Sequence, residues 1–78
     1  MTIQQVRTIE TFPASLDIVR AMLYLGMPVD SRKCDNHLQL QEVIRLCKRI
    51  YGMDIEAERV YKDESDLRRY SCIYRLKH

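Results

Sequence analysis

The sequence is poor in the residues from which most catalytic and phosphate-binding sites are built. It contains two glycines, too few for a glycine-rich loop that cradles a phosphate. Its two histidines, one of them the last residue, have no serine or cysteine partner at a spacing typical of nucleophilic catalysis. No pair of carboxylates stands on an apolar background that would raise a pKa. The sequence therefore predicts a protein that is not an enzyme and has no cofactor.

The pattern of the cysteines is a weak signal for a metal site. The three cysteines, an odd number, and the lack of an apolar leader predict free thiols in a reducing compartment. Cys34 and His37 form one local pair, but the other two thiols are distant. These thiols, Cys47 and Cys72, fall on apolar faces, where cysteine behaves as a small hydrophobe. We expect a cytoplasmic protein without a metal site.

No long apolar run is present, and neither sign of charge dominates. The longest apolar run is too short to span a bilayer, so no membrane partner is expected. With 13 basic and 11 acidic residues the net charge is +2, which neither demands nor excludes an anionic partner. The 78 residues and their 46% hydrophobic content predict one folded domain over residues 1–78, with a small core.

The clearest pattern present is a helix from near Asn36 to Tyr51. Its apolar side chains recur at the spacing of one helix face: Leu40, Val43, Ile44, Cys47, Ile50 and Tyr51. The opposite face is polar and becomes cationic toward its end: His37, Gln41, Arg45 and Lys48. Gly52 stands where a left-handed C-cap is expected, and the late cations suit the negative end of the helix dipole.

After Gly52 the apolar period changes from 3.6 to 2, which predicts two strands. In the first strand, Ile55, Ala57 and Tyr61 alternate with charged residues. In the second, the apolar set is Tyr70, Cys72, Tyr74 and Leu76. Residues 63–66 lie between the strands, contain no apolar residue and predict the tip of an antiparallel hairpin. The tyrosines favour core packing with the hydroxyl at the rim over stacking on single-stranded bases.

The first half of the chain predicts a platform for the helix and the hairpin. Residues 15–25 predict a helix that has a single narrow polar stripe and is otherwise apolar, so it is either central or packs against a second copy. Gly26 as C-cap and Pro28 end it. Residues 1–13 favour a strand or extended arm, with a short helix as the alternative. Asp30 predicts the cap of a short helix over residues 31–37, with Cys34 and Leu38 facing inward.

Three stretches resemble the recognition helix and wing of small winged helix-turn-helix proteins that are common in phage and prophage genomes. They are VIRL (43–46), DIEAERV (54–60) and RYSCIYRL (69–76). The resemblance covers about half of the chain directly. It implies an α+β fold in which two or three helices are followed by a C-terminal antiparallel hairpin, the wing.

The resemblance also implies a DNA-binding regulator of phage or mobile-element type, with the long helix in the major groove of double-stranded DNA. Base contacts are then expected from the side chains that suit base edges: His37, Gln39, Gln41 and Arg45. Phosphate contacts are expected from the surrounding cations: Arg32, Lys33, Lys48, Arg49, Lys62, Arg68 and Arg69. The acidic residues at the hairpin tip depart from the family pattern and argue against wing insertion into the minor groove.

Other interpretations of the same pattern stay open. The polar face of the long helix would also be explained by an ordinary solvent-exposed surface without a binding partner. The near-neutral charge and the acidic tip favour a protein-interaction module, such as a phage-encoded inhibitor or adaptor with a host protein partner. The apolar first helix favours a homodimer, and a dimer would also suit a DNA-binding module that covers only a half-site.

Overall fold

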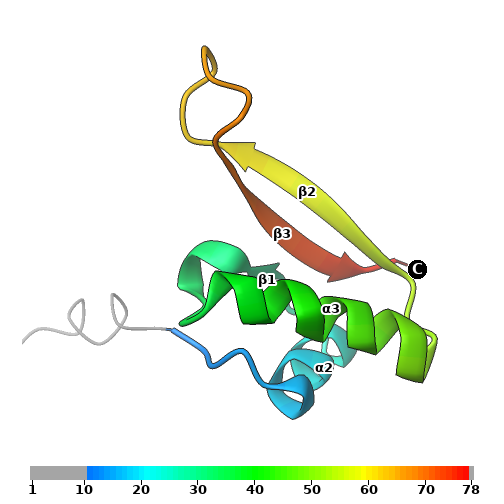
Figure 1. Ribbon diagram of the computed structural model, residues 1–78. Helices are drawn as coiled ribbons and strands as arrows, with labels where there is room; N and C mark the ends of the chain where they lie inside the picture. The colour runs from blue at the N-terminus through cyan, green and yellow to red at the C-terminus, as the bar shows by residue number, and fades with distance from the viewer. Residues whose placement is uncertain (1–10, 78) are drawn as a thin grey trace, which may run out of the picture.

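The computed structural model of the protein describes residues 11–77, which form two helices and a small antiparallel sheet (Figure 1). In chain order the elements are helix α2 (Leu16–Tyr24), strand β1 (Val29–Asp30), the 3-10 turn η1 (Ser31–Lys33), helix α3 (His37–Tyr51) and strands β2 (Ile55–Tyr61) and β3 (Tyr70–Leu76). The strand order in the sheet is β1-β3-β2, with both pairs antiparallel. The expected α+β class and the C-terminal hairpin are confirmed.

Helix α3 begins and ends where its local signals predict. The side chain of Asn36 accepts a hydrogen bond from the backbone N–H of Gln39 at 3.0 Å, which makes Asn36 the N-cap. Gly52 ends the helix in the left-handed conformation with φ 61°. Contrary to the prediction, Ile50 and Tyr51 are 56% and 36% exposed. The last turn of α3 extends beyond α2 (Figure 1). The Tyr51 ring is in contact with α2 through the Arg20 guanidinium, which lies 4.4 Å from its centroid.

Helix α2 matches its predicted range but is less buried than its sequence suggests. Its end is a Schellman motif, in which the Gly26 N–H donates to the Leu23 carbonyl at 3.1 Å and the Met27 N–H to the Met22 carbonyl at 2.9 Å. Only two of its side chains, Val19 and Leu23, are buried. The prediction of a central helix is wrong, because among the described residues only one side of α2 is covered.

The segment between the helices differs most from expectation. The short helix predicted over residues 31–37 is a single 3-10 turn, although Asp30 caps it as predicted by accepting from the Arg32 N–H at 3.0 Å. Cys34 faces inward, whereas Leu38 is 76% exposed because it lies on the outer face of the first turn of α3. The two-residue strand β1 was not predicted, because periodicity needs a longer segment.

The part of the N-terminal segment that the structure describes is held on the turn η1. Phe12 forms an isolated parallel bridge with Cys34, in which its N–H donates to the Lys33 carbonyl at 3.0 Å and its carbonyl accepts from the Asp35 N–H at 3.1 Å. Thr11 to Pro13 are otherwise without helix or strand. The prediction of a strand or arm over residues 1–13 otherwise concerns positions outside the described residues.

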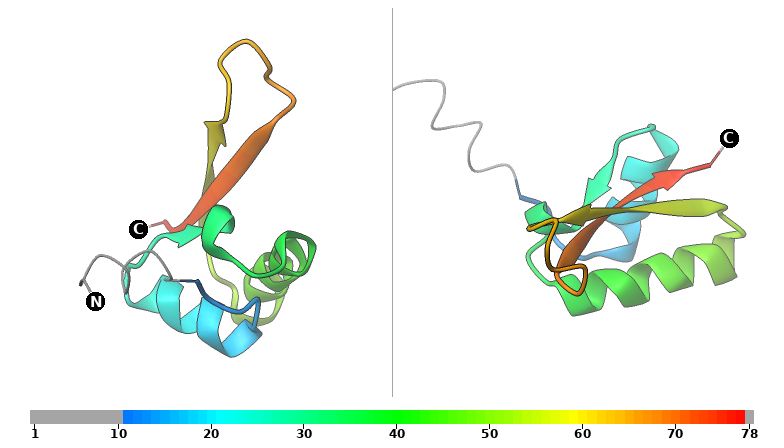
Figure 2. Two further views of the ribbon diagram at one scale, coloured as in Figure 1. Left: turned by 90° about the vertical axis from the view of Figure 1, so that its left-hand side faces the viewer. Right: turned by 90° about the horizontal axis from the view of Figure 1, so that it is seen from above.

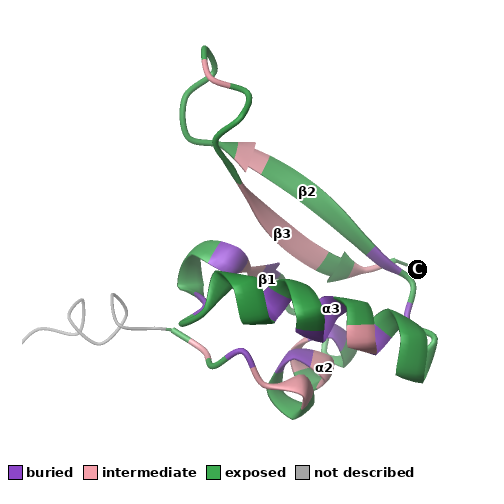
Figure 3. Ribbon diagram, in the orientation of Figure 1, coloured by how far each residue is buried: buried purple, intermediate pink, exposed green. Residues whose placement is uncertain are grey.

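The core lies between α2, α3 and one face of the sheet (Figure 3). Its fully buried side chains are Val19, Leu23, Val29, Leu40 and Cys47. Because directly paired residues share a sheet face, the pairing of Val29 with Tyr74 shows which face of β3 points inward. Neither helix of the described part combines the length and apolar character that a membrane span requires.

The hairpin of β2 and β3 projects away from this core (Figure 2). Its base, at the pair Ile55 and Leu76, packs on the core, whereas Tyr61 and Tyr70 form the last pair before the tip. Both strands are confirmed, but the predicted burial of their apolar face holds only near the base. Ala57 and Tyr61 are exposed because the hairpin diverges from α3 toward its tip (Figure 1).

Candidate nucleic-acid interface

The exposed face of α3 carries cations that form no ion pair with the residues that the structure describes. His37, Gln41, Arg45, Lys48 and Arg49 are all solvent-exposed. Within residues 11–77, the last three of these residues take part in no ion pair. They stand on consecutive turns, so their charge is concentrated over the second half of the helix. Such a surface attracts anions.

Most of the other arginines face carboxylates. The Arg32 guanidinium donates to both carboxylate oxygens of Asp30, with 2.7 Å for the shortest contact, and this hydrogen bonding is the main reason why the pKa of Asp30 is lowered. Arg68 and Arg69 approach Asp66 at 3.5 and 3.9 Å. Arg75 pairs with Glu58 at 2.8 Å, across the strands of the hairpin. Three of the cations that form no ion pair among residues 11–77 therefore stand together on α3.

A small cavity separates the N-terminal half of α3 from β3. Its volume is about 180 Å³, and its walls include His37 and Gln41 from α3 and Tyr70 and Cys72 from β3. The hairpin starts at the end of α3 and diverges from this helix toward its tip (Figure 1). We call the space between α3 and the hairpin, which includes this cavity, the wedge. None of the residues that line the cavity is acidic.

The hairpin presents an aromatic and cationic cluster on the side of the wedge. The rings of Tyr61 and Tyr70 meet edge to face with 5.8 Å between centroids. The Arg59 guanidinium lies over the Tyr70 ring, 4.6 Å from its centroid. The pKa of Arg59 is raised, first by the neighbouring Tyr61 hydroxyl and then by Tyr70. The strand register places Arg59 opposite Cys72, on the same sheet face as the tyrosine pair.

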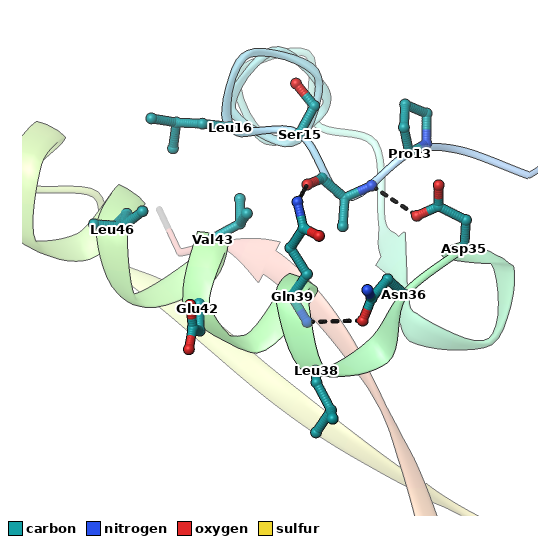
Figure 4. Close-up of a pocket in the computed structure, with 11 residues that line it drawn as sticks. Pro13, Ser15, Leu16, Asp35, Asn36, Leu38, Gln39, Glu42, Val43 and Leu46 are labelled. Atoms are coloured by element: carbon teal, nitrogen blue, oxygen red, sulfur yellow. Dashed lines mark hydrogen bonds between the residues drawn. The ribbon is translucent and has the colours of Figure 1, made fainter.

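Gln39, a predicted base contact, lies on the α2 side of α3. Its side-chain amide donates to the Ala14 carbonyl at 2.9 Å, in a groove between the start of α2 and the start of α3 (Figure 4). Lys33 lines a different cavity, together with Phe12 and Met22. That cavity also contains Ile73, which the strand alternation places on the sheet face opposite Cys72.

The structure therefore brings together part of the predicted set. Five of the predicted residues share the exposed surface of α3: His37, Gln41, Arg45, Lys48 and Arg49. The other five do not join them. Arg32, Arg68 and Arg69 form ion pairs with aspartates, Gln39 binds the Ala14 carbonyl, and Lys33 lines another cavity. Sequence reasoning did not single out Arg59 as a contact. The only signal for it was the strand register, which places Arg59 and Tyr70 on one face.

The cysteines do not gather with other metal-ligating side chains. Among the described residues, no group of three or more histidine, cysteine, aspartate or glutamate side chains is arranged to hold a metal ion. All three thiols are free, with Cys34 and Cys47 buried and Cys72 partly exposed. Burial raises the pKa of Cys47, and burial together with the nearby Cys72 raises the pKa of Tyr74 to about 12.

Comparison of the chain with protein-family models, with curated proteins and with solved structures gives no match.

Proposed function

We propose that the protein binds double-stranded DNA, as a winged helix-turn-helix regulator of phage or mobile-element type. The observation that carries the proposal is the exposed face of α3, where Arg45, Lys48 and Arg49 stand without an acidic partner among residues 11–77. Duplex DNA is a polyanion, and cations that displace its counterions supply most of its sequence-independent affinity for proteins.

The geometry of α3 suits the major groove. The groove admits one α-helix, and the 15 residues of α3 are enough to cross it. Gln41 and Arg45 then face base edges, because glutamine pairs with adenine and arginine with guanine through two hydrogen bonds each. Lys48 and Arg49, farther along the helix, fix its position on the flanking phosphates. In this proposal the hairpin is the wing.

The proposal is tested by a fluorescence-anisotropy titration of the full chain on a generic duplex at several salt concentrations. Each of the variants Arg45→Gln, Lys48→Gln and Arg49→Gln should weaken binding severalfold and reduce the salt slope by about 1. Arg75→Gln is the matched control, because it removes the same charge from a side chain that is paired with Glu58. Absence of binding by the wild-type chain at low salt would exclude the proposal.

A protein-interaction module is the second candidate, and one observation favours it. Helix α2 and the segment after it expose apolar side chains, with Ile18 at 41%, Leu25 at 76% and Met27 at 48%. Such a surface suits a second copy of the chain or a host protein. Sedimentation equilibrium of the wild type and of Ile18→Glu distinguishes these partners, because a homodimer would dissociate in the variant.

A further inference from the structure

The outer half of the hairpin has side chains whose arrangement core packing does not explain. Tyr61 and Tyr70 are 38% and 44% exposed, although each is large enough to contribute substantially to a small core. They form the last strand pair before the tip of the hairpin, which projects from the body (Figure 2). Part of both side chains is therefore exposed on the inner face of the hairpin.

Arg59 gives this surface a charge. Its guanidinium is stacked on Tyr70 and, among the described residues, pairs with no carboxylate. A guanidinium stacked through its plane keeps the N–H groups at its edge available, and their fork geometry matches two oxygens of a phosphate. The stacking also restricts the side chain, so less conformational entropy is lost when it binds.

The opposite wall of the wedge suits the same ligand. His37 and Gln41 project from α3 toward the cavity that Tyr70 and Cys72 close on the other side. Both are polar, and none of the residues that line the cavity would repel an anion. A chain of phosphates between these walls would meet hydrogen-bond donors from the helix and from the hairpin.

The hairpin tip is unsuited to that ligand. Residues 62–69 contain three bases and three acids, so the tip has no net charge. Asp63 accepts from the Ser65 N–H at 3.0 Å and from the Ser65 hydroxyl at 2.9 Å, which lowers its pKa and keeps it ionised. Asp66 faces both arginines of the tip. Arg59, by contrast, is on the inner face of the hairpin and has no carboxylate partner among residues 11–77.

We infer that one sugar–phosphate strand of the bound duplex runs through the wedge, where Arg59, held by Tyr70, binds a phosphate, while the hairpin tip stays off the DNA. This inference rests on the proposed function. It assigns the DNA contact of the hairpin to its inner face instead of its tip. It also gives Arg59 a phosphate contact in addition to those of Lys48 and Arg49, and this contact fixes the orientation of α3 in the groove.

The test is a set of three charge-neutralising variants in the same hairpin. Arg59→Gln, on the inner face, should weaken binding to a duplex of about 20 base pairs by about tenfold and reduce the salt slope by about 1. Arg69→Gln at the tip and Arg75→Gln on the opposite face should each stay within about twofold of wild type. Arg59→Lys keeps the charge but loses the planar fork, so its salt slope should match that of wild type.

Each other outcome overturns the inference. If the wild type binds and Arg59→Gln binds with unchanged affinity and salt slope, the inference fails while the proposed function stands. If Arg69→Gln loses as much affinity as Arg59→Gln, the tip is the contact. If Arg59→Gln and Tyr70→Leu weaken binding equally and neither variant changes the salt slope, Arg59 only supports the hairpin and the inference fails. If the wild type does not bind a duplex, the proposed function fails as well.

Discussion

The side-chain amide of Gln39 donates a hydrogen bond to the backbone carbonyl of Ala14, with 2.9 Å between the two atoms. The N–H of Ala14 donates in turn to the carboxylate of Asp35 at 3.0 Å. Ala14 is 4% exposed, so these contacts satisfy both backbone polar groups of a buried residue. These two hydrogen bonds connect the start of α2 to the start of α3, and Gln39 makes one of them.

Replacing Gln39 by alanine should lower the free energy of unfolding by about 1 to 2 kcal/mol, because the Ala14 carbonyl would lose its partner. Urea unfolding followed by circular dichroism measures the change. Gln41→Ala is the matched control, since Gln41 is exposed one half-turn away and makes no hydrogen bond to other side chains or loops of the described part. Equal stability of the two variants would contradict the role given to Gln39.

Gly52→Ala should destabilise the protein by about 1 kcal/mol, because Gly52 has φ 61° and an L-residue is disfavoured there. A Cβ at this position meets nothing within 4 Å, so the cost is conformational and not steric. Gly52→Asn should cost less, since asparagine tolerates the left-handed region. Thermal unfolding of both variants measures the difference, and a larger loss for asparagine than for alanine would contradict this reasoning.

The ion pair of Asp30 and Arg32 should make stability depend on pH in the acid range. The hydrogen bond to Arg32 lowers the pKa of Asp30 below its ordinary value of 3.8. The contribution is therefore complete above the unfolded pKa and is lost as the pH falls through the lower, folded pKa. It should be small, because the Arg32 guanidinium is exposed and solvent screens the ion pair. Urea midpoints between neutral pH and pH 2 should show a flatter curve for Asp30→Asn; a curve parallel to that of wild type would contradict the prediction.

The three thiols should differ in reactivity toward a neutral disulfide reagent in the native protein. Cys72 is partly exposed and lines the wedge, so it should react first. Cys47 is 0% exposed and its pKa is raised by burial, and Cys34 is 7% exposed, so both should react only on unfolding. Mass spectrometry after timed labelling identifies the modified cysteine. Fast labelling of Cys47 in folded protein would contradict the described packing.

Local signals were sufficient for the main elements. Asn36 and Gly52 act on backbone groups within a few residues, so the ends of α3 could be predicted without the rest of the fold. The change of period after Gly52 likewise predicted the two strands of the hairpin. The strand β1 escaped prediction because two residues show no periodicity; its position is fixed by pairing with β3.

Burial could not be predicted to the same extent, because it depends on what lies opposite a side chain. Ile50 continues the apolar face of α3, yet it is 56% exposed, because the last turn of α3 extends beyond α2. Leu25, the C-cap residue of α2, is apolar as well and is 76% exposed. Periodic apolar residues show that a helix face can be buried. Which of its side chains are buried depends on the elements that pack against that face.

The sequence by itself determined which side chains α3 can offer, since the helix period alone places Gln41, Arg45 and Lys48 on a polar surface. Only the tertiary structure decided which cations are free. Arg75 meets Glu58 through strand register, and Arg59 meets Tyr70 in the same way. The physical reason is that helix faces follow from neighbours a few residues apart, whereas ion pairing and stacking depend on distances between residues that only the folded chain brings together.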